Sequence, residues 1–415
     1  MPANDSNTQA ARAYLSCFLI CLALLMLAGG LIIAPWLAFW LYQSGDAALE
    51  RVVSKQASGE FVLFGSGLSQ DFVDYKLELY KKVKPEIVAI GSSRVMQFRG
   101  AWFRQKFLNL GGVAGNLPVL ASTINAMLKM AKPRAVIIGI DFWWFMPAWD
   151  DEPEKIVPPT HGTYNYSLAS LKKPLEWLLE GKISFSELGA PVLGAFGKGF
   201  RADRFGIMAQ QTDDGFGPDG SWYYTAETSG IRPALDYKFQ DTLEAVEHGM
   251  RAFFHALPGQ EAPGASHIDV FADIICKLKS RGVKTFIFMP PLASAVLQKM
   301  RPERYPHLFR LRKALAERGI EVAEFTNPQS TGTGDCEFID GFHGGEIAYA
   351  RILRALADRW PALLPYVNME RLDSLIANWA GRATAPDPRV TERPEQDFLG
   401  LGCKKINANP IEDGK

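Results

Sequence analysis

The residues best suited to do chemistry are a serine and a histidine that lie far apart in the chain. Ser93 belongs to the run Gly91-Ser92-Ser93-Arg94, which follows a short apolar stretch. A serine on a sharp turn between a strand and a helix exposes its hydroxyl, and backbone N–H groups nearby can bind an oxyanion. Because serine alone is a weak nucleophile, it needs a base and an orienting partner for that base.

A second run supplies both groups. Asp340 precedes His343 by three residues, so its carboxylate can fold back and hold one imidazole tautomer, leaving the other ring nitrogen for Ser93. Each signal has a plainer interpretation. The Gly-Ser-Ser run is alternatively an ordinary turn or helix cap, and Asp340 is alternatively a capping residue beside an exposed His343. The remaining histidines have no Asp at comparable spacing, and we interpret them as ordinary surface or core residues.

Two further stretches lie where a substrate would bind. The run 109–116 is rich in glycine and ends in Gly115 and Asn116, and glycine lets the backbone approach a substrate closely. Trp143 and Trp144 directly follow an apolar run, so they lie near the predicted site and are candidates for substrate binding. The alternative for the many aromatic side chains beyond this pair is packing in a core or lid.

These residues must be positioned by an α/β fold. Strand-like apolar runs alternate with helical patterns, the strands at 86–91, 107–110, 135–140, 284–289 and 321–325 and the helices at 117–130, 267–279, 303–318 and 346–358. This order predicts a doubly wound, mostly parallel sheet, flavodoxin-like in type, whose active groups gather at the carboxyl ends of the strands. An aromatic-rich insertion without strong strand pattern is expected at about 142–262, and a mobile tail from about 382.

The amino-terminal region predicts a membrane anchor. No charged residue occurs from 13 to 45, and about 20 apolar residues suffice to cross a bilayer. A cleaved signal peptide has a much shorter apolar core, and a buried core helix is rarely so long. We therefore expect a cytoplasmic leader at 1–12, one transmembrane helix at 13–42, a catalytic domain at 46–363 outside the cytoplasm, and a C-terminal helix and tail at 364–415.

Charge and cysteine content limit the possibilities further. The chain has 45 basic and 45 acidic residues, so it lacks the basic excess typical of nucleic-acid binding, and we expect no nucleic-acid partner. Beyond the anchor there are three cysteines, and Cys336 either pairs with Cys276 or Cys403 or remains a free thiol. No metal-ligand cluster, phosphate loop or dinucleotide fingerprint is present in the sequence, so we expect no metal and no cofactor.

Taken together, Gly-x-Ser after the first strand, Asn-x-Gly…Gly after the second and Asp-x-x-His before the last helix resemble the SGNH/GDSL hydrolase superfamily. The resemblance covers roughly 85–142 and 264–360. It implies an SGNH-hydrolase-like fold, with Ser93 as nucleophile, His343 as general base and Asp340 as its orienting partner. It also implies that the backbone N–H of Gly115 belongs to the oxyanion hole.

The sequence departs from this pattern at two positions. Ser92 replaces the Asp of Gly-Asp-Ser, and Asp141 stands where the family often has Asn. A carboxylate cannot donate the hydrogen bond that the Asn amide gives an oxyanion unless it is protonated. Either Arg94 or Asn116 substitutes as the donor, or Asp141 is structural.

The anchor followed by a Gly-Ser-Ser motif resembles one branch of the family, which includes alginate O-acetyltransferase and teichoic-acid D-alanyl transfer proteins. This resemblance implies a periplasmic or extracellular serine acyltransferase in the cytoplasmic membrane, which moves acetyl or another acyl group to an exported polysaccharide. It also implies a polytopic membrane-bound O-acyltransferase as partner. The alternatives are an SGNH-type esterase or deacetylase, and a catalytically silent glycan-binding component of a polymer assembly complex.

Overall fold

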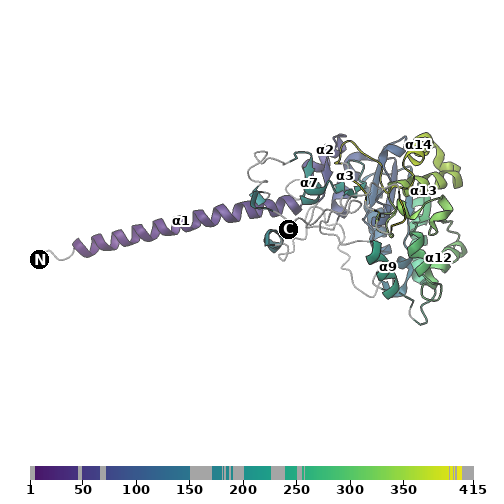
Figure 1. Cartoon of the computed structure of the whole chain (residues 1–415), viewed down its shortest axis with the longest axis horizontal. Helices are drawn as coiled ribbons and strands as arrows, with labels where there is room; N and C mark the ends of the chain where they lie inside the picture. Colours follow the sequence, from purple (N-terminus) through teal and green to yellow (C-terminus); the bar gives the residue numbers. More distant parts are fainter. Residues whose placement is uncertain are drawn as a thin grey trace. The chain divides into compact units, whose positions relative to one another are not determined.

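The computed structural model describes most of the chain (Figure 1). The described residues are 5–44, 49–65, 72–149, 171–179, 201–225, 239–249, 255–256 and 258–391, with shorter stretches at 181, 184–186, 188–189, 393–395, 397 and 400–403. They divide into two compact units: Met1–Ala48 with Tyr164–Ala202, and Leu49–Thr163 with Asp203–Lys415.

A five-stranded parallel sheet forms the centre of the larger unit. Its strands lie in the order β3-β2-β4-β8-β9, with bounds β2 Ile87–Gly91, β3 Phe107–Gly111, β4 Ala135–Gly139, β8 Lys284–Met289 and β9 Ala323–Glu324. Every neighbouring pair is parallel. All residues of β2, β3 and β4 are buried, as expected for parallel strands covered on both faces. The predicted mixed α/β class and mostly parallel sheet are therefore confirmed.

Different helices cover the two faces of this sheet. On one face, alternate strand residues such as Ile87, Ile137 and Phe288 pack with Tyr349 and Leu353 of α13. The helix α10, Ala265–Ser280, packs against β8 and against α4, Leu117–Met130.

The helices of the larger unit have clear ends. Asn116 caps α4 by accepting the N–H of Val119, and Pro118 occupies the first turn, where its missing N–H has no cost. Helices appear at all four predicted positions, as α4 Leu117–Met130, α10 Ala265–Ser280, α12 Pro306–Glu317 and α13 Glu346–Arg359. Within the described residues, this unit also contains the α-helices α2 Leu49–Ala57, α3 Val73–Val83, α7 Ile207–Thr212, α9 Phe239–His248, α11 Ser294–Lys299 and α14 Met369–Trp379.

The insertion contains strands that its sequence did not predict. A second sheet has the order β5-β1-β6-β7, from β1 Leu63–Phe64, β5 Arg204–Phe205, β6 Gly215–Phe216 and β7 Trp222–Tyr223. Strands of two residues are too short to show a repeating pattern, so only their pairing reveals them. Much of the rest of the insertion lies outside the described residues.

The described residues of the tail after residue 382, which we expected to be mobile, make several specific contacts. The carboxylate of Glu395 is buried and accepts the N–H groups of Ala383 and Thr384. A disulfide joins Cys336 to Cys403, whose Cα atoms are 5.5 Å apart. Side-chain hydrogen bonds and a covalent link hold this segment without regular secondary structure. Residues 404–415 lie outside the described part of the chain.

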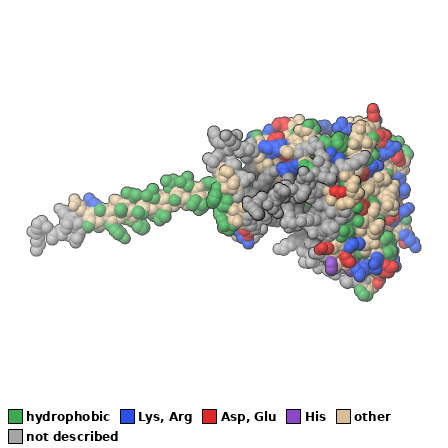
Figure 2. Space-filling model, viewed as in Figure 1, with side chains coloured by type: hydrophobic (Ala, Val, Ile, Leu, Met, Phe, Trp, Pro, Cys, Tyr) green, Lys and Arg blue, Asp and Glu red, His purple; other side chains and the backbone are tan. Residues whose placement is uncertain are grey.

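The smaller unit contains the apolar helix α1, Asp5–Ser44. Its stretch Thr8–Trp40 is long and apolar enough to cross a membrane, a test that a signal sequence near the N-terminus also passes. Figure 2 shows hydrophobic side chains along this helix. A short helix, α5 Lys173–Leu179, belongs to the same unit and contacts α1.

Candidate active site

Ser93 lies directly after β2, at the carboxyl edge of the sheet. It begins the short 3-10 helix η1, Ser93–Val95, and the Ser92 hydroxyl caps this helix by accepting the N–H of Arg94. A Cβ on Gly91 would lie 2.5 Å from Val95 Cγ2 and 2.6 Å from the carbonyl oxygen of Gly139. Any larger residue at position 91 would clash with Val95 and with the backbone of β4, which explains the glycine.

The structure brings Ser93, His343 and Asp340 together in one hydrogen-bonded chain. Ser93 Oγ lies 2.8 Å from His343 Nε2, and His343 Nδ1 lies 2.7 Å from Asp340 Oδ2. The other Asp340 oxygen accepts the backbone N–H groups of Phe342 at 3.0 Å and His343 at 2.7 Å. His343 and Asp340 are buried and Ser93 is half-buried, so the serine hydroxyl is the accessible end of the chain.

Several contacts hold the loop that carries Asp340 and His343. Glu337 is buried and forms a two-pronged ion pair with Arg351 of α13, at 2.9 and 3.0 Å. The preceding Cys336 forms the disulfide to Cys403. The Asp335 carboxylate accepts N–H groups at the start of α11. Of these contacts, the sequence analysis considered only the pairing of Cys336, with Cys276 or Cys403 as its alternative partners.

The glycine-rich loop after β3 folds back onto the serine turn. The N–H of Gly112, which has a φ of 89°, donates to the carbonyls of Gly91 and Ser92. Asn109 strengthens this junction, since its amide donates to the carbonyls of Val95 and Phe98. The sequence placed Asn109 in the loop but did not predict this positioning role.

Two backbone N–H groups near this turn remain available for an oxyanion. Within the described residues, the N–H groups of Ser93 and Gly115 have no hydrogen-bond acceptor. The Asn116 side-chain oxygen is already engaged in capping α4. Unsatisfied N–H groups beside a nucleophile are the usual components of an oxyanion hole.

Arg94, a candidate oxyanion donor, makes several buried hydrogen bonds to other loops. Its guanidinium is buried and donates to Asp141 at 2.9 Å, to the carbonyls of Pro290 and Pro291 at 3.0 and 2.6 Å, and to the carbonyl of Phe342 at 3.3 Å. The side chain therefore engages acceptors through all three nitrogens and connects the loops after β2, β4 and β8 with the histidine loop.

Asp141 serves as the counter-ion of Arg94. The side chains of Arg94 and Asp141 are 2% and 1% exposed. Burial raises the pKa of the Asp141 carboxyl, while the charge of Arg94 and a hydrogen bond from Ser92 oppose this change. A buried arginine without a partner would be very costly, so an acidic residue is expected at this position.

The structure buries both tryptophans that we considered for substrate binding. Trp144 is fully buried, so it offers no open face for stacking on a sugar. Trp143 packs against the Phe342 ring at 5.4 Å and lies 5.7 Å from the Arg94 guanidinium. Trp143 thus packs against the loop that carries His343. The ring of Tyr224, from the insertion, lies 6.1 Å from His343, a proximity that only tertiary structure creates.

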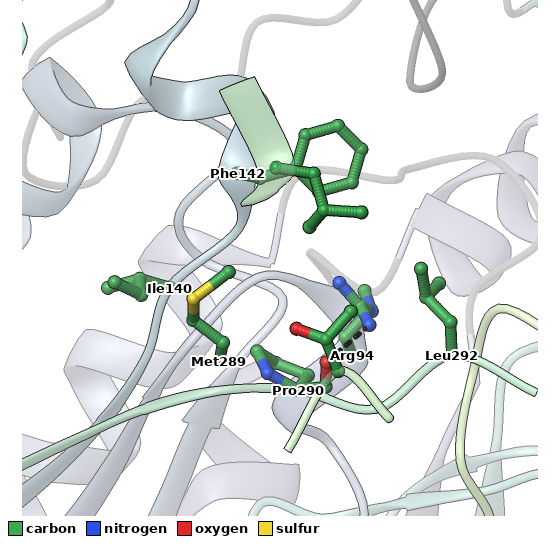
Figure 3. A pocket seen from close by; sticks show the side chains of 8 residues that line it. Arg94, Ile140, Phe142, Met289, Pro290 and Leu292 are labelled. Carbon is green, nitrogen blue, oxygen red and sulfur yellow. Dashed lines mark hydrogen bonds between the residues drawn. The ribbon is translucent and has the colours of Figure 1, made fainter. Parts of the chain in front are cut away.

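A small pocket borders the Arg94 guanidinium. Figure 3 shows Arg94 and Pro290 there with Ile140, Phe142, Met289 and Leu292. Its interior leaves no room for a water molecule. This pocket is therefore too small to be a substrate cavity.

The arrangement as a whole can activate a serine hydroxyl. A carboxylate orients an imidazole, and the imidazole contacts the hydroxyl, as activation of a serine requires. Among the described residues, no group of three or more His, Cys, Asp or Glu side chains is arranged to hold a metal ion. No protein-family model matches the chain, and no curated protein sequence matches it.

Proposed function

We propose that the protein is a membrane-anchored serine acyltransferase that acts on an exported polysaccharide through an acyl-Ser93 intermediate. The observation that carries this proposal is the chain of hydrogen bonds from Ser93 through His343 to Asp340. The strand order β3-β2-β4-β8-β9, with helices on both faces, supports a doubly wound SGNH-like fold.

In the first half-reaction, Ser93 takes the acyl group. Asp340 accepts the Nδ1–H of His343, so the lone pair on Nε2 faces the serine hydroxyl. His343 removes the hydroxyl proton while Ser93 Oγ forms a bond to the acyl carbonyl carbon. The bond between that carbon and the donor's leaving group then breaks, and His343 returns the proton to the leaving group.

In the second half-reaction, a sugar hydroxyl replaces the leaving group. Its proton passes to His343 Nε2, its oxygen bonds to the acyl carbon, and the bond to Ser93 Oγ breaks as the serine regains a proton. The N–H groups of Ser93 and Gly115 would stabilise the oxyanion in both steps, since they have no acceptor within the described residues. Water in place of the sugar would make the same site an esterase.

Two features support a location outside the cytoplasm. The helix α1 suits a single membrane crossing, and the Cys336–Cys403 disulfide suits an oxidising compartment. A catalytic domain tethered to the outer face of the cytoplasmic membrane needs an acyl donor from inside the cell. A polytopic membrane-bound O-acyltransferase would supply it, and this partner is part of the proposal.

A serine-directed fluorophosphonate probe tests the nucleophile. We expect the full-length protein in detergent to be labelled, and Ser93→Ala to lose labelling because its reactive oxygen is gone. Ser92→Ala is the matched control: it removes the cap of η1 and the Ser92 hydrogen bond to Asp141, but it keeps the Ser93 hydroxyl and should keep the label. Normal labelling of Ser93→Ala, or none of the wild type, would contradict the proposed mechanism.

The acyl content of the surface polymer tests the transfer step. A strain that carries His343→Ala should lose polymer acylation, because the base for both half-reactions is missing. His248→Ala changes an exposed histidine outside the site and should leave acylation unchanged. Increased acylation in the His343→Ala strain would instead indicate a deacetylase, and unchanged acylation a silent component.

A further inference from the structure

Large apolar side chains are exposed around α5, in the unit that contains α1. Leu179 and Phe185 are 79% and 78% exposed, and Leu175 is exposed as well. Single exposed apolar residues are ordinary on protein surfaces. Whether these three side chains mark a binding surface therefore depends on where α5 lies along α1.

The contacts of α5 fix that position at the C-terminal end of the apolar helix. The indole N–H of Trp36 donates to the carbonyl of Leu171 at 2.8 Å. The rings of Phe39 and Trp177 meet edge to face at 6.4 Å. Phe39 and Trp40 are buried, whereas the α1 side chains that precede residue 34 are exposed almost without exception.

This end of α1 corresponds to the surface of a bilayer. The apolar stretch Thr8–Trp40 has 33 residues, which makes it about 50 Å long, whereas the hydrocarbon core is about 30 Å thick. The excess length must lie outside the core or be taken up by tilt. Trp36 and Trp40 mark the C-terminal end as the part in the headgroup region, where tryptophan is favoured.

We propose that α5 and residues 184–186 form a membrane-surface segment, whose partner is the lipid bilayer itself. Leu175, Leu179 and Phe185 insert between the headgroups and the upper acyl chains, as the apolar side of an interfacial helix does. The inference rests on α1 crossing the membrane, but not on the chemistry at Ser93. Continuity with the membrane helix favours lipid over a protein partner as the occupant of this surface.

The segment provides a second membrane attachment for the catalytic unit. The chain passes between the two units at three places, next to residues 48, 163 and 202. The insertion therefore connects to the catalytic unit at both of its ends. A domain attached in this way is restrained beside the membrane more strongly than one on a single linker.

Site-specific labelling in vesicles tests this proposal. The full-length protein, with Cys17, Cys21 and Cys276 replaced by Ala and the disulfide kept, is reconstituted alone in phosphatidylcholine vesicles. Phe185→Cys and Leu179→Cys are each labelled with an environment-sensitive fluorophore. Nitroxide-bearing lipids then quench it from the headgroup region or from deep in the acyl chains. Leu25→Cys in α1 and Phe309→Cys in α12, both at exposed positions, are the membrane and solvent controls.

We expect blue-shifted emission at positions 185 and 179, with stronger quenching by the shallow nitroxide than by the deep one. The label at position 25 should be quenched most by the deep nitroxide, and the label at position 309 by neither. Unquenched, water-like emission at 185 and 179 with normal quenching at 25 would overturn the proposal and leave this surface to a protein partner. Absence of quenching at 25 would overturn the membrane crossing, and with it this inference, while leaving the proposed chemistry at Ser93 intact.

Discussion

The substitution Asp141→Asn separates two roles for the residue that follows β4. As counter-ion of Arg94, Asp141 contributes a charge to an ion pair of 2.9 Å that is almost completely buried. As an incomplete oxyanion donor, it would be improved by an amide. The two roles predict opposite results for the same variant.

The structure indicates how much stability Asp141→Asn should lose if Asp141 is the counter-ion of Arg94. Breaking a buried ion pair by removing one charge costs about 3–5 kcal/mol. Arg94 keeps three carbonyl acceptors, from Pro290, Pro291 and Phe342, so we expect the lower end, about 3 kcal/mol. We also expect slower fluorophosphonate labelling, because Arg94 holds the carbonyl next to His343.

Chemical unfolding and the rate of labelling measure the two effects. Asp269→Asn is the matched control, since Asp269 pairs with Arg318 at 2.7 Å on the surface, where such a pair contributes about 0–1 kcal/mol. A double variant, Arg94→Gln with Asp141→Asn, should recover part of the lost stability because no unpaired charge remains. An Asp141→Asn variant that is as stable as the wild type and labels about a hundredfold faster would refute our reasoning, since that is the gain from one oxyanion donor.

Three other changes have defined outcomes. Asp340→Asn should slow probe labelling by about 10⁴-fold, because an amide N–H facing Nδ1 moves the imidazole proton to Nε2; labelling at the wild-type rate would contradict the triad. Burial lowers the pKa of His307 from 6.5 to about 4. Between these pH values the histidine takes up a proton in the unfolded chain but not in the folded one. The free energy of unfolding should therefore fall by about 3 kcal/mol as the pH drops from 6.5 to 4. Urea midpoints measured across that range should show this loss in the wild type but not in His307→Phe, and an equal loss in both would exclude His307 as its cause. Cys403→Ser opens a link between residues 67 apart and should lower the free energy of unfolding by about 4 kcal/mol in the chain-entropy model; an unchanged denaturant midpoint would show that the disulfide contributes little.

Much of the central sheet was predictable because its signals are local. Runs such as 135–140 are apolar at every position, and a parallel strand covered on both faces requires this. The start of α4 was equally visible, since Asn116 caps it and Pro118 lies in its first turn. The second sheet was not predictable, because its two-residue strands have no period and depend on pairing with distant segments.

For the site, the sequence by itself determined the candidate nucleophile, base and orienting acid. Ser93, His343 and Asp340 each follow from residue type, short spacing and position at a strand end. The partners of Arg94 and Cys336 were decided only by tertiary structure. Three loops from distant parts of the chain supply four acceptors for the five N–H groups of Arg94. The spacing of nearby residues can be read directly from the sequence, because it does not depend on folding. Burial and long-range hydrogen bonds exist only after the chain has folded.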